Sequence, residues 1–165
     1  MKEPKKDGSA WCTVLSALNE EDDNWYFDSG ASNHFSKSDA MLEDLQQYGG
    51  TVVAANRGAM KVVAKGRMQL TPKSCPDSPI VVNDVQVIPE LSSNLLSVNQ
   101  IVKRGCTVIF NSAGVKVLNS DGDVMATGTR YRELFKLDLR SQERRAHSLA
   151  RLRLISRSGT SAWDT

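Results

Sequence analysis

The sequence has few of the residues that build disulfide frameworks or metal centres. Its three cysteines, Cys12, Cys75 and Cys106, are an odd number at no metal-ligand spacing in 165 residues. This argues against a disulfide-stapled fold and a zinc site, so we expect reduced thiols. The two histidines, His34 and His147, have no partner at triad or metal spacing, and His34 is interpreted as a structural or surface residue. No metal and no cofactor are predicted.

Long apolar runs and strong net charge are also missing. No run approaches the roughly 18 apolar residues of a membrane span, and residues 1–10 lack the apolar core of a signal peptide. The chain is therefore expected to be soluble and cytoplasmic, either free or within intracellular particles, with no membrane partner. A formal charge of +2 is too small to indicate nucleic-acid binding by itself.

Aromatic and basic residues are not interleaved as they are in a base-stacking surface. Trp11, Trp25 and Tyr26 are interpreted as core or dimer contacts. The C-terminal region concentrates arginine, which favours a solvated tail whose contact with nucleic acid is at most weak. These arginines are Arg140, Arg144, Arg145, Arg151, Arg153 and Arg157.

What the chain does contain is a series of short β-rich runs separated by turn residues, which predicts an all-β fold. Residues 11–18 fit either a first strand or a short helix. A hairpin is expected around Asn56-Arg57-Gly58, and Pro89 is expected to end a strand. Strands are predicted at residues 25–27, 51–55, 59–64, 67–70, 80–82, 85–88, 106–110, 114–118, 123–127 and 133–139.

One helix is predicted, over residues 95–104. Its apolar residues recur at helical spacing, with Ser92, Ser93 or Asn94 available as the N-cap and Gly105 just beyond the end. The resulting domain organisation is a partly disordered leader at 1–20, one β domain at 21–139 and a basic flexible tail at 140–165.

The motif richest in chemistry is Asp28-Ser29-Gly30-Ala31-Ser32, directly after the apolar run Trp25-Tyr26-Phe27. A glycine in the turn permits the backbone conformation that aims a carboxylate into a cleft, and the serine hydroxyls can support it. Asp-Ser-Gly alone is also common turn chemistry. Two close carboxylates that share a proton form the working unit of an aspartic protease. Because the motif occurs once, a second chain must supply the other carboxylate.

In its order of motifs the chain resembles the protease of copia-type retrotransposons, a branch of the retropepsin-like aspartic proteases, over residues 25–139. Four segments carry the resemblance. They are Trp25 to His34, the hairpin Val52 to Gly58, Gly66 before the next strand, and Asp84 to Val98.

The resemblance implies a closed β-barrel that is active as a homodimer on an extended peptide or polyprotein. Asp28 is then the catalytic residue, supported by Ser29, Gly30, Ala31 and Ser32. Residues 51–63 correspond to the flap over substrate, and the hydrophobic step before the helix corresponds to the base of the active site. The flap residues are Ala54, Ala55, Asn56, Arg57 and Gly58, and the active-site base is Leu95, Leu96 and Ser97.

The chain departs from the family outside the protease region. It has no Cys/His zinc knuckle, and residues 150–156 resemble a degraded start of the pre-integrase segment, so no metal site is supported there. The chain is therefore expected to be a protease, a polyprotein fragment, or a decayed or host-retained element. Two functions follow: an aspartic endopeptidase of a retrotransposon-type polyprotein, or a proteolytically silent, retained retropepsin-like dimerisation or interaction module.

Overall fold

The computed structural model describes residues 11–12, 23–54 and 57–140. Within these residues one short helix, α1, accompanies a single eleven-stranded sheet. Residues 141–165 of the predicted tail, most of the predicted leader, and flap residues Ala55 and Asn56 lie outside this part of the chain. The elements are β1 (Trp11–Cys12), β2 (Trp25–Asp28), β3 (Phe35–Ser36), β4 (Glu43–Ala54), β5 (Ala59–Leu70), β6 (Ile80–Val87), β7 (Asn94–Ser97), α1 (Val98–Lys103), β8 (Thr107–Asn111), β9 (Gly114–Leu118), β10 (Val124–Tyr131) and β11 (Leu134–Leu137).

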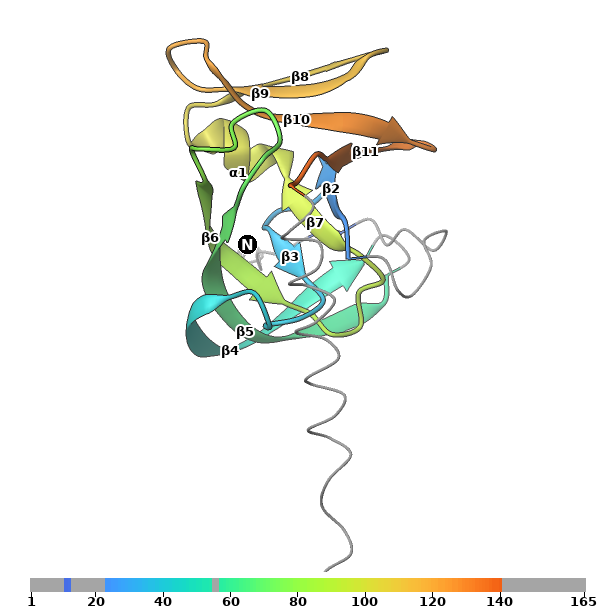
Figure 1. The fold of residues 1–165 in the computed structure, drawn as a ribbon. Coiled ribbons are helices and arrows are strands. Elements are labelled where there is room, and N and C mark those ends of the chain that lie inside the picture. The colour runs from blue at the N-terminus through green and yellow to red at the C-terminus, as the bar shows by residue number, and fades with distance from the viewer. Residues whose placement is uncertain (1–10, 13–22, 55–56, 141–165) are drawn as a thin grey trace, which may run out of the picture.

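The predicted all-β class with one short helix is confirmed, but the sheet is not a closed barrel. Its strand order is β1-β4-β5-β6-β3-β7-β2-β11-β10-β9-β8, so β1 and β8 are its two edges. Figure 1 shows β4 and β5 curving around one end of the molecule, while β8, β9 and β10 lie across the other end above α1. The C-terminal strands extend the sheet away from its curled half, so the two edges do not meet.

Strand β2 lies between a parallel and an antiparallel neighbour. It pairs in parallel with β7, where Trp25 is the partner of Asn94, and antiparallel with β11. Side chains alternate between the faces of a strand. Accordingly Trp25 and Phe27 enter one apolar cluster, whereas Tyr26, which is fully buried, enters another. The predicted buried strand at 25–27 is therefore confirmed, and Asp28 follows it directly.

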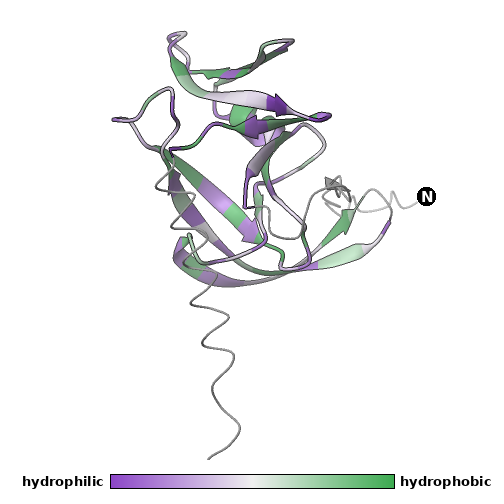
Figure 2. Ribbon diagram, turned by 45° about the vertical axis from the view of Figure 1, so that its right-hand side comes forward, coloured by the Kyte–Doolittle hydropathy of each residue, from purple (hydrophilic) through white to green (hydrophobic). Residues whose placement is uncertain are grey.

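The long hairpin β4–β5 starts earlier and runs further than the sequence pattern predicts. Strand β4 begins at Glu43, and its first seven residues are exposed, so they show no apolar alternation. Strand β5 continues through Gly66, which the sequence placed between two strands. Figure 2 shows the hydrophilic stretch of this hairpin in its curved middle and the hydrophobic stretch near its tip.

Residues 80–88 were predicted as two strands around Asn83-Asp84, and this prediction is wrong. The chain forms one strand, β6, ending at Val87 before Pro89. Asp84 has a φ of 56°, which aspartate tolerates better than most residues. The pairing of β6 with β5 shifts in register between Gly66 and Met68 of β5. The irregularity at Asn83-Asp84 is therefore a bulge within a continuous ladder.

The helix is shorter than predicted. Leu95 and Leu96 belong to the fully buried strand β7, and α1 begins at Val98 with Ser97 as its N-cap. Of the predicted caps, Ser92 and Ser93 precede that strand and Asn94 is its first residue. Gly105 follows the helix at a φ of 84°, as expected for a residue after a helix end. No helix in the described part of the chain is long and apolar enough to span a membrane.

Candidate active site

Asp28 is the last residue of β2 and the Cα partner of Ser97, the last residue of β7. The backbone N–H of Gly30 donates to Oδ1 of Asp28 at 2.8 Å, which closes an Asx turn immediately after the strand. Asp28 is half-buried, whereas Ser29 and Gly30 are exposed. The predicted turn thus holds one carboxylate at the end of a buried strand and near the surface.

A groove of about 380 Å³ lies beside this carboxylate. Aromatic rings form much of its wall: Phe110 stands edge-on to Phe27 at 6.4 Å and to Phe135 at 5.1 Å between ring centroids. The side chain of Glu133 is paired with Arg130 at 3.1 Å. The groove therefore combines acidic groups with apolar rings. Its lining residues are Phe27, Asp28, Ser29, Phe110, Glu133, Leu134 and Phe135.

The predicted supporting residues come together behind Asp28. Ala31 is buried, and its carbonyl accepts a hydrogen bond from Ser97 Oγ at 2.6 Å. Leu95 and Leu96 pair with Tyr26 and Phe27 in the parallel ladder and are 2% and 3% exposed. The step Leu95-Leu96-Ser97 therefore lies directly beside the strand that carries Asp28.

The predicted flap is the end of the β4–β5 hairpin. The amide of Ala54 donates to Gly58 and the amide of Arg57 donates to Ala54, both at 2.8 Å. Arg57 has a φ of 65°, a left-handed conformation within the turn. Val52, Ala54, Met60 and Val62 are buried in the same apolar cluster as Ala31. The inner face of the hairpin thus packs with the segment after Asp28, and Arg57 and Gly58 are exposed.

His34 is a buried residue of this site, with 3% of its surface exposed. Its Nδ1 accepts the backbone N–H of Ser97 at 3.1 Å. The pKa of His34 is lowered from 6.5 to about 4, chiefly by burial and also by the charge of Arg104, while Asp84 opposes the shift. The imidazole is therefore neutral at physiological pH and acts as a hydrogen-bond acceptor.

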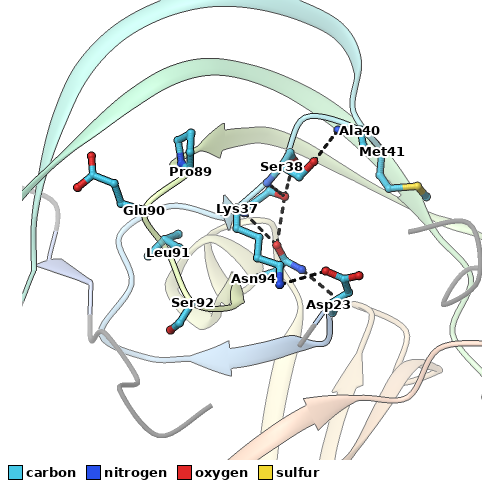
Figure 3. Close-up of a pocket in the computed structure, with 11 residues that line it drawn as sticks. Asp23, Lys37, Ser38, Ala40, Met41, Pro89, Glu90, Leu91, Ser92 and Asn94 are labelled. Atoms are coloured by element: carbon cyan, nitrogen blue, oxygen red, sulfur yellow. Dashed lines mark hydrogen bonds and ion pairs between the residues drawn. The ribbon is translucent and has the colours of Figure 1, made fainter. Parts of the chain in front are cut away.

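A larger pocket, of about 470 Å³, lies around the start of β7 and away from Asp28 (Figure 3). Lys37 pairs with Asp23 at 3.1 Å, and the buried Asn94 accepts from Ser36 Oγ and from the Lys37 amide. The amide nitrogen of Asn94 donates to the carbonyl of Asp23. Because these polar groups bond to one another, the cluster ties β3, β7 and the start of β2 together.

Several residues at the site are not predicted from the sequence. Phe110 and Phe135 line the groove from β8 and β11, and Glu133 lines it from the turn between β10 and β11. No local sequence signal links these residues to Asp28. Gln100 donates from Nε2 to the carbonyl of Ser32 at 2.7 Å. Ser97-x-x-Gln100 is a capping-box spacing, so this motif was a visible signal for Gln100.

Metal ligands do not gather in the described residues: no group of three or more His, Cys, Asp or Glu side chains could hold an ion there. Cys75 and Cys106 are free thiols. The thiol of Cys75 donates to the carbonyl of Val124 at 2.8 Å.

The family model described as Pol polyprotein, beta-barrel domain matches residues 25–106, which run from β2 to just beyond α1. This match supports a Pol-type region, of the kind found in retrotransposon and retroviral polyproteins. The family description names a barrel of a polyprotein and no enzymatic activity. A comparison with curated proteins gives no significant match.

Proposed function

We propose that this chain is an aspartic endopeptidase of a retrotransposon-type polyprotein, active as a homodimer on extended peptides. Peptide hydrolysis needs one carboxylate to activate water and a second, protonated carboxyl group to protonate the reacting carbonyl and the leaving nitrogen. Each chain supplies one Asp-Ser-Gly turn, at Asp28. The second carboxyl group is therefore the Asp28 of another copy.

The observation that carries the proposal is the setting of Asp28. The carboxylate ends a buried strand, is held by the Gly30 amide at 2.8 Å, and opens into a groove of about 380 Å³. The β4–β5 hairpin packs its inner face with Ala31 of the same turn. A carboxylate that lines a groove, with a hairpin adjacent to it, supports peptide binding in extended form, as strand-lined clefts bind peptides.

The test compares the wild-type chain with Asp28→Asn at micromolar concentration and mildly acidic pH, with a peptide library as substrate and mass spectrometry as readout. Wild type should cleave and Asp28→Asn should not, while sedimentation velocity finds the same dimer for both. Mixing the two proteins should lower activity as the square of the wild-type fraction, because mixed dimers carry one aspartate.

Equal cleavage by both proteins, or no cleavage by a wild-type chain that sediments as a dimer, would overturn the proposal. A wild-type monomer that cleaves nothing at any concentration would instead favour the alternative, a silent interaction module.

A further inference from the structure

Ser97 and Gln100 have the spacing of a helix capping box, but one of its two hydrogen bonds is replaced. In a capping box the cap hydroxyl accepts from the backbone of the third helical residue, whose side chain then accepts from the N–H of the cap residue. The first bond is present, from the Gln100 amide to Ser97 Oγ at 3.1 Å. In place of the second, the N–H of Ser97 donates to His34 Nδ1 at 3.1 Å.

His34 thereby leaves the side-chain amide of Gln100 available for other contacts. Gln100 Nε2 donates to the carbonyl of Ser32 at 2.7 Å and contacts Asn33 Oδ1 at 3.4 Å. Ser97 Oγ donates to the carbonyl of Ala31 at 2.6 Å. The residues at 97–100 therefore hold the segment 28–34, which we call the Asp28 loop, at Ala31, Ser32, Asn33 and His34.

We propose that Gln100 and His34 are positioning residues that fix the Asp28 loop, and through it the direction of the Asp28 carboxylate; this inference rests on the proposed peptidase function. Asp28 itself is fixed at the other end of the loop by its pairing with Ser97 in the parallel ladder. Ser97 therefore contacts both ends of the loop: it is the Cα partner of Asp28, and its N–H donates to His34. A small displacement of a reacting group lowers kcat more than it weakens substrate binding, because the reaction requires close alignment of the reacting atoms.

The test replaces the donor of Gln100 without changing its size. Gln100→Glu places a carboxylate oxygen against the Ser32 carbonyl, so we expect kcat to fall by about tenfold to a hundredfold, with KM nearly unchanged. Gln100→Lys restores an N–H donor and should recover most of kcat. The matched control is Asn99→Asp, the same amide-to-acid change at an exposed position of the helix, and it should leave kcat unchanged.

His34 has its own pair of variants. His34→Asn retains an acceptor near the position of Nδ1 and should keep kcat close to wild type. His34→Leu removes the acceptor and should lower kcat by a factor similar to that of Gln100→Glu. If kcat falls equally in both His34 variants, in proportion to their loss of stability, His34 has only a packing role. That result would overturn the part of the inference that concerns His34.

Amide hydrogen exchange over residues 29–33 provides a readout that does not depend on catalysis. Exchange should be faster in Gln100→Glu than in wild type or Asn99→Asp. Faster exchange in a chain whose wild type cleaves nothing would overturn the proposed function while supporting the hold of Gln100 on the loop. Unchanged exchange and full activity in Gln100→Glu would overturn the inference and leave the function standing.

Discussion

Asp28 and Ser97 are Cα partners at the ends of two parallel strands, β2 and β7. This register places the candidate catalytic carboxylate beside the residue that caps α1 and bonds to Ala31. A strand pairing, a helix cap and a turn therefore meet at one serine. The position of the Asp28 turn therefore depends on the hydrogen bonds that fix Ser97.

Substituting Ser97 by alanine tests this dependence. The hydroxyl accepts from Gln100 N–H at 3.1 Å and donates to the Ala31 carbonyl at 2.6 Å in a fully buried position. Loss of the cap and of a buried hydrogen bond should lower the free energy of unfolding by about 2 kcal/mol. Urea unfolding followed by fluorescence measures this difference.

Ser93 offers a matched control for Ser97. It is also buried, at 2% exposure, but its hydroxyl has no hydrogen-bond partner among the described residues. Ser93→Ala removes an unsatisfied polar group, so the free energy of unfolding should stay equal or rise. A loss as large as that of Ser97→Ala would contradict this reading of both serines.

Glycine is predicted to be required at position 66 by the close antiparallel pairing of β4 and β5. A Cβ at this position would lie 2.7 Å from the backbone oxygen of Glu43 and 3.2 Å from the side chain of Leu42. Because backbone must move to admit a methyl group, Gly66→Ala should lower the free energy of unfolding by about 1–3 kcal/mol. Thermal and urea unfolding of the purified variant measure the loss.

The matched glycine for this experiment is Gly49, in strand β4 of the same hairpin. A Cβ there would meet nothing within 4 Å. Gly49→Ala should therefore be neutral or stabilise the chain by up to about 1 kcal/mol, because glycine in a strand loses more conformational freedom on folding. Similar losses for both variants would mean that the contact with Glu43 does not decide the effect.

Local signals in the sequence predicted part of this fold well. The run Trp25–Phe27 is aromatic and bounded by polar residues, and it is the buried strand β2. The turns at residues 111–114 and 119–123 also separate strands where the sequence indicates. Each of these features depends on residues close together in the chain, so a pattern over a few positions is sufficient to find it.

Other features could not be read locally. The exposed start of β4 has no apolar alternation, and it is a strand because it pairs with β5. Asn83-Asp84 has the composition of a turn, yet the ladder with β5 continues through it. The contacts of Gln100 with Ser32 and of Ser97 with His34 join residues 68 and 63 positions apart. Their existence depends on the tertiary structure.

Arg57 gives a prediction for the tip of the β4–β5 hairpin. It is exposed and has a φ of 65°, a region that β-branched residues strongly disfavour. Arg57→Val should lower the free energy of unfolding by about 1–2 kcal/mol, whereas Arg57→Asn should be neutral or slightly stabilising. Lys61→Val, at an exposed position of β5, is the control and should have little effect. Equal stability of the two Arg57 variants would contradict the left-handed turn.

His34 predicts how stability depends on pH. Its pKa is lowered in the folded chain from 6.5 to about 4, chiefly by burial, so at intermediate pH the unfolded chain binds the additional proton. The contribution of neutral His34 to the free energy of unfolding is therefore complete above pH 6.5 and declines as the pH falls toward about 4. It changes little further below that pH. Its size is on the order of 3 kcal/mol. Urea unfolding at intervals from pH 4 to 7 should show this slope in wild type and a shallower one in His34→Asn, whose side chain does not titrate. If the stability of wild type and of His34→Asn changes equally with pH, other groups cause the pH dependence and His34 does not.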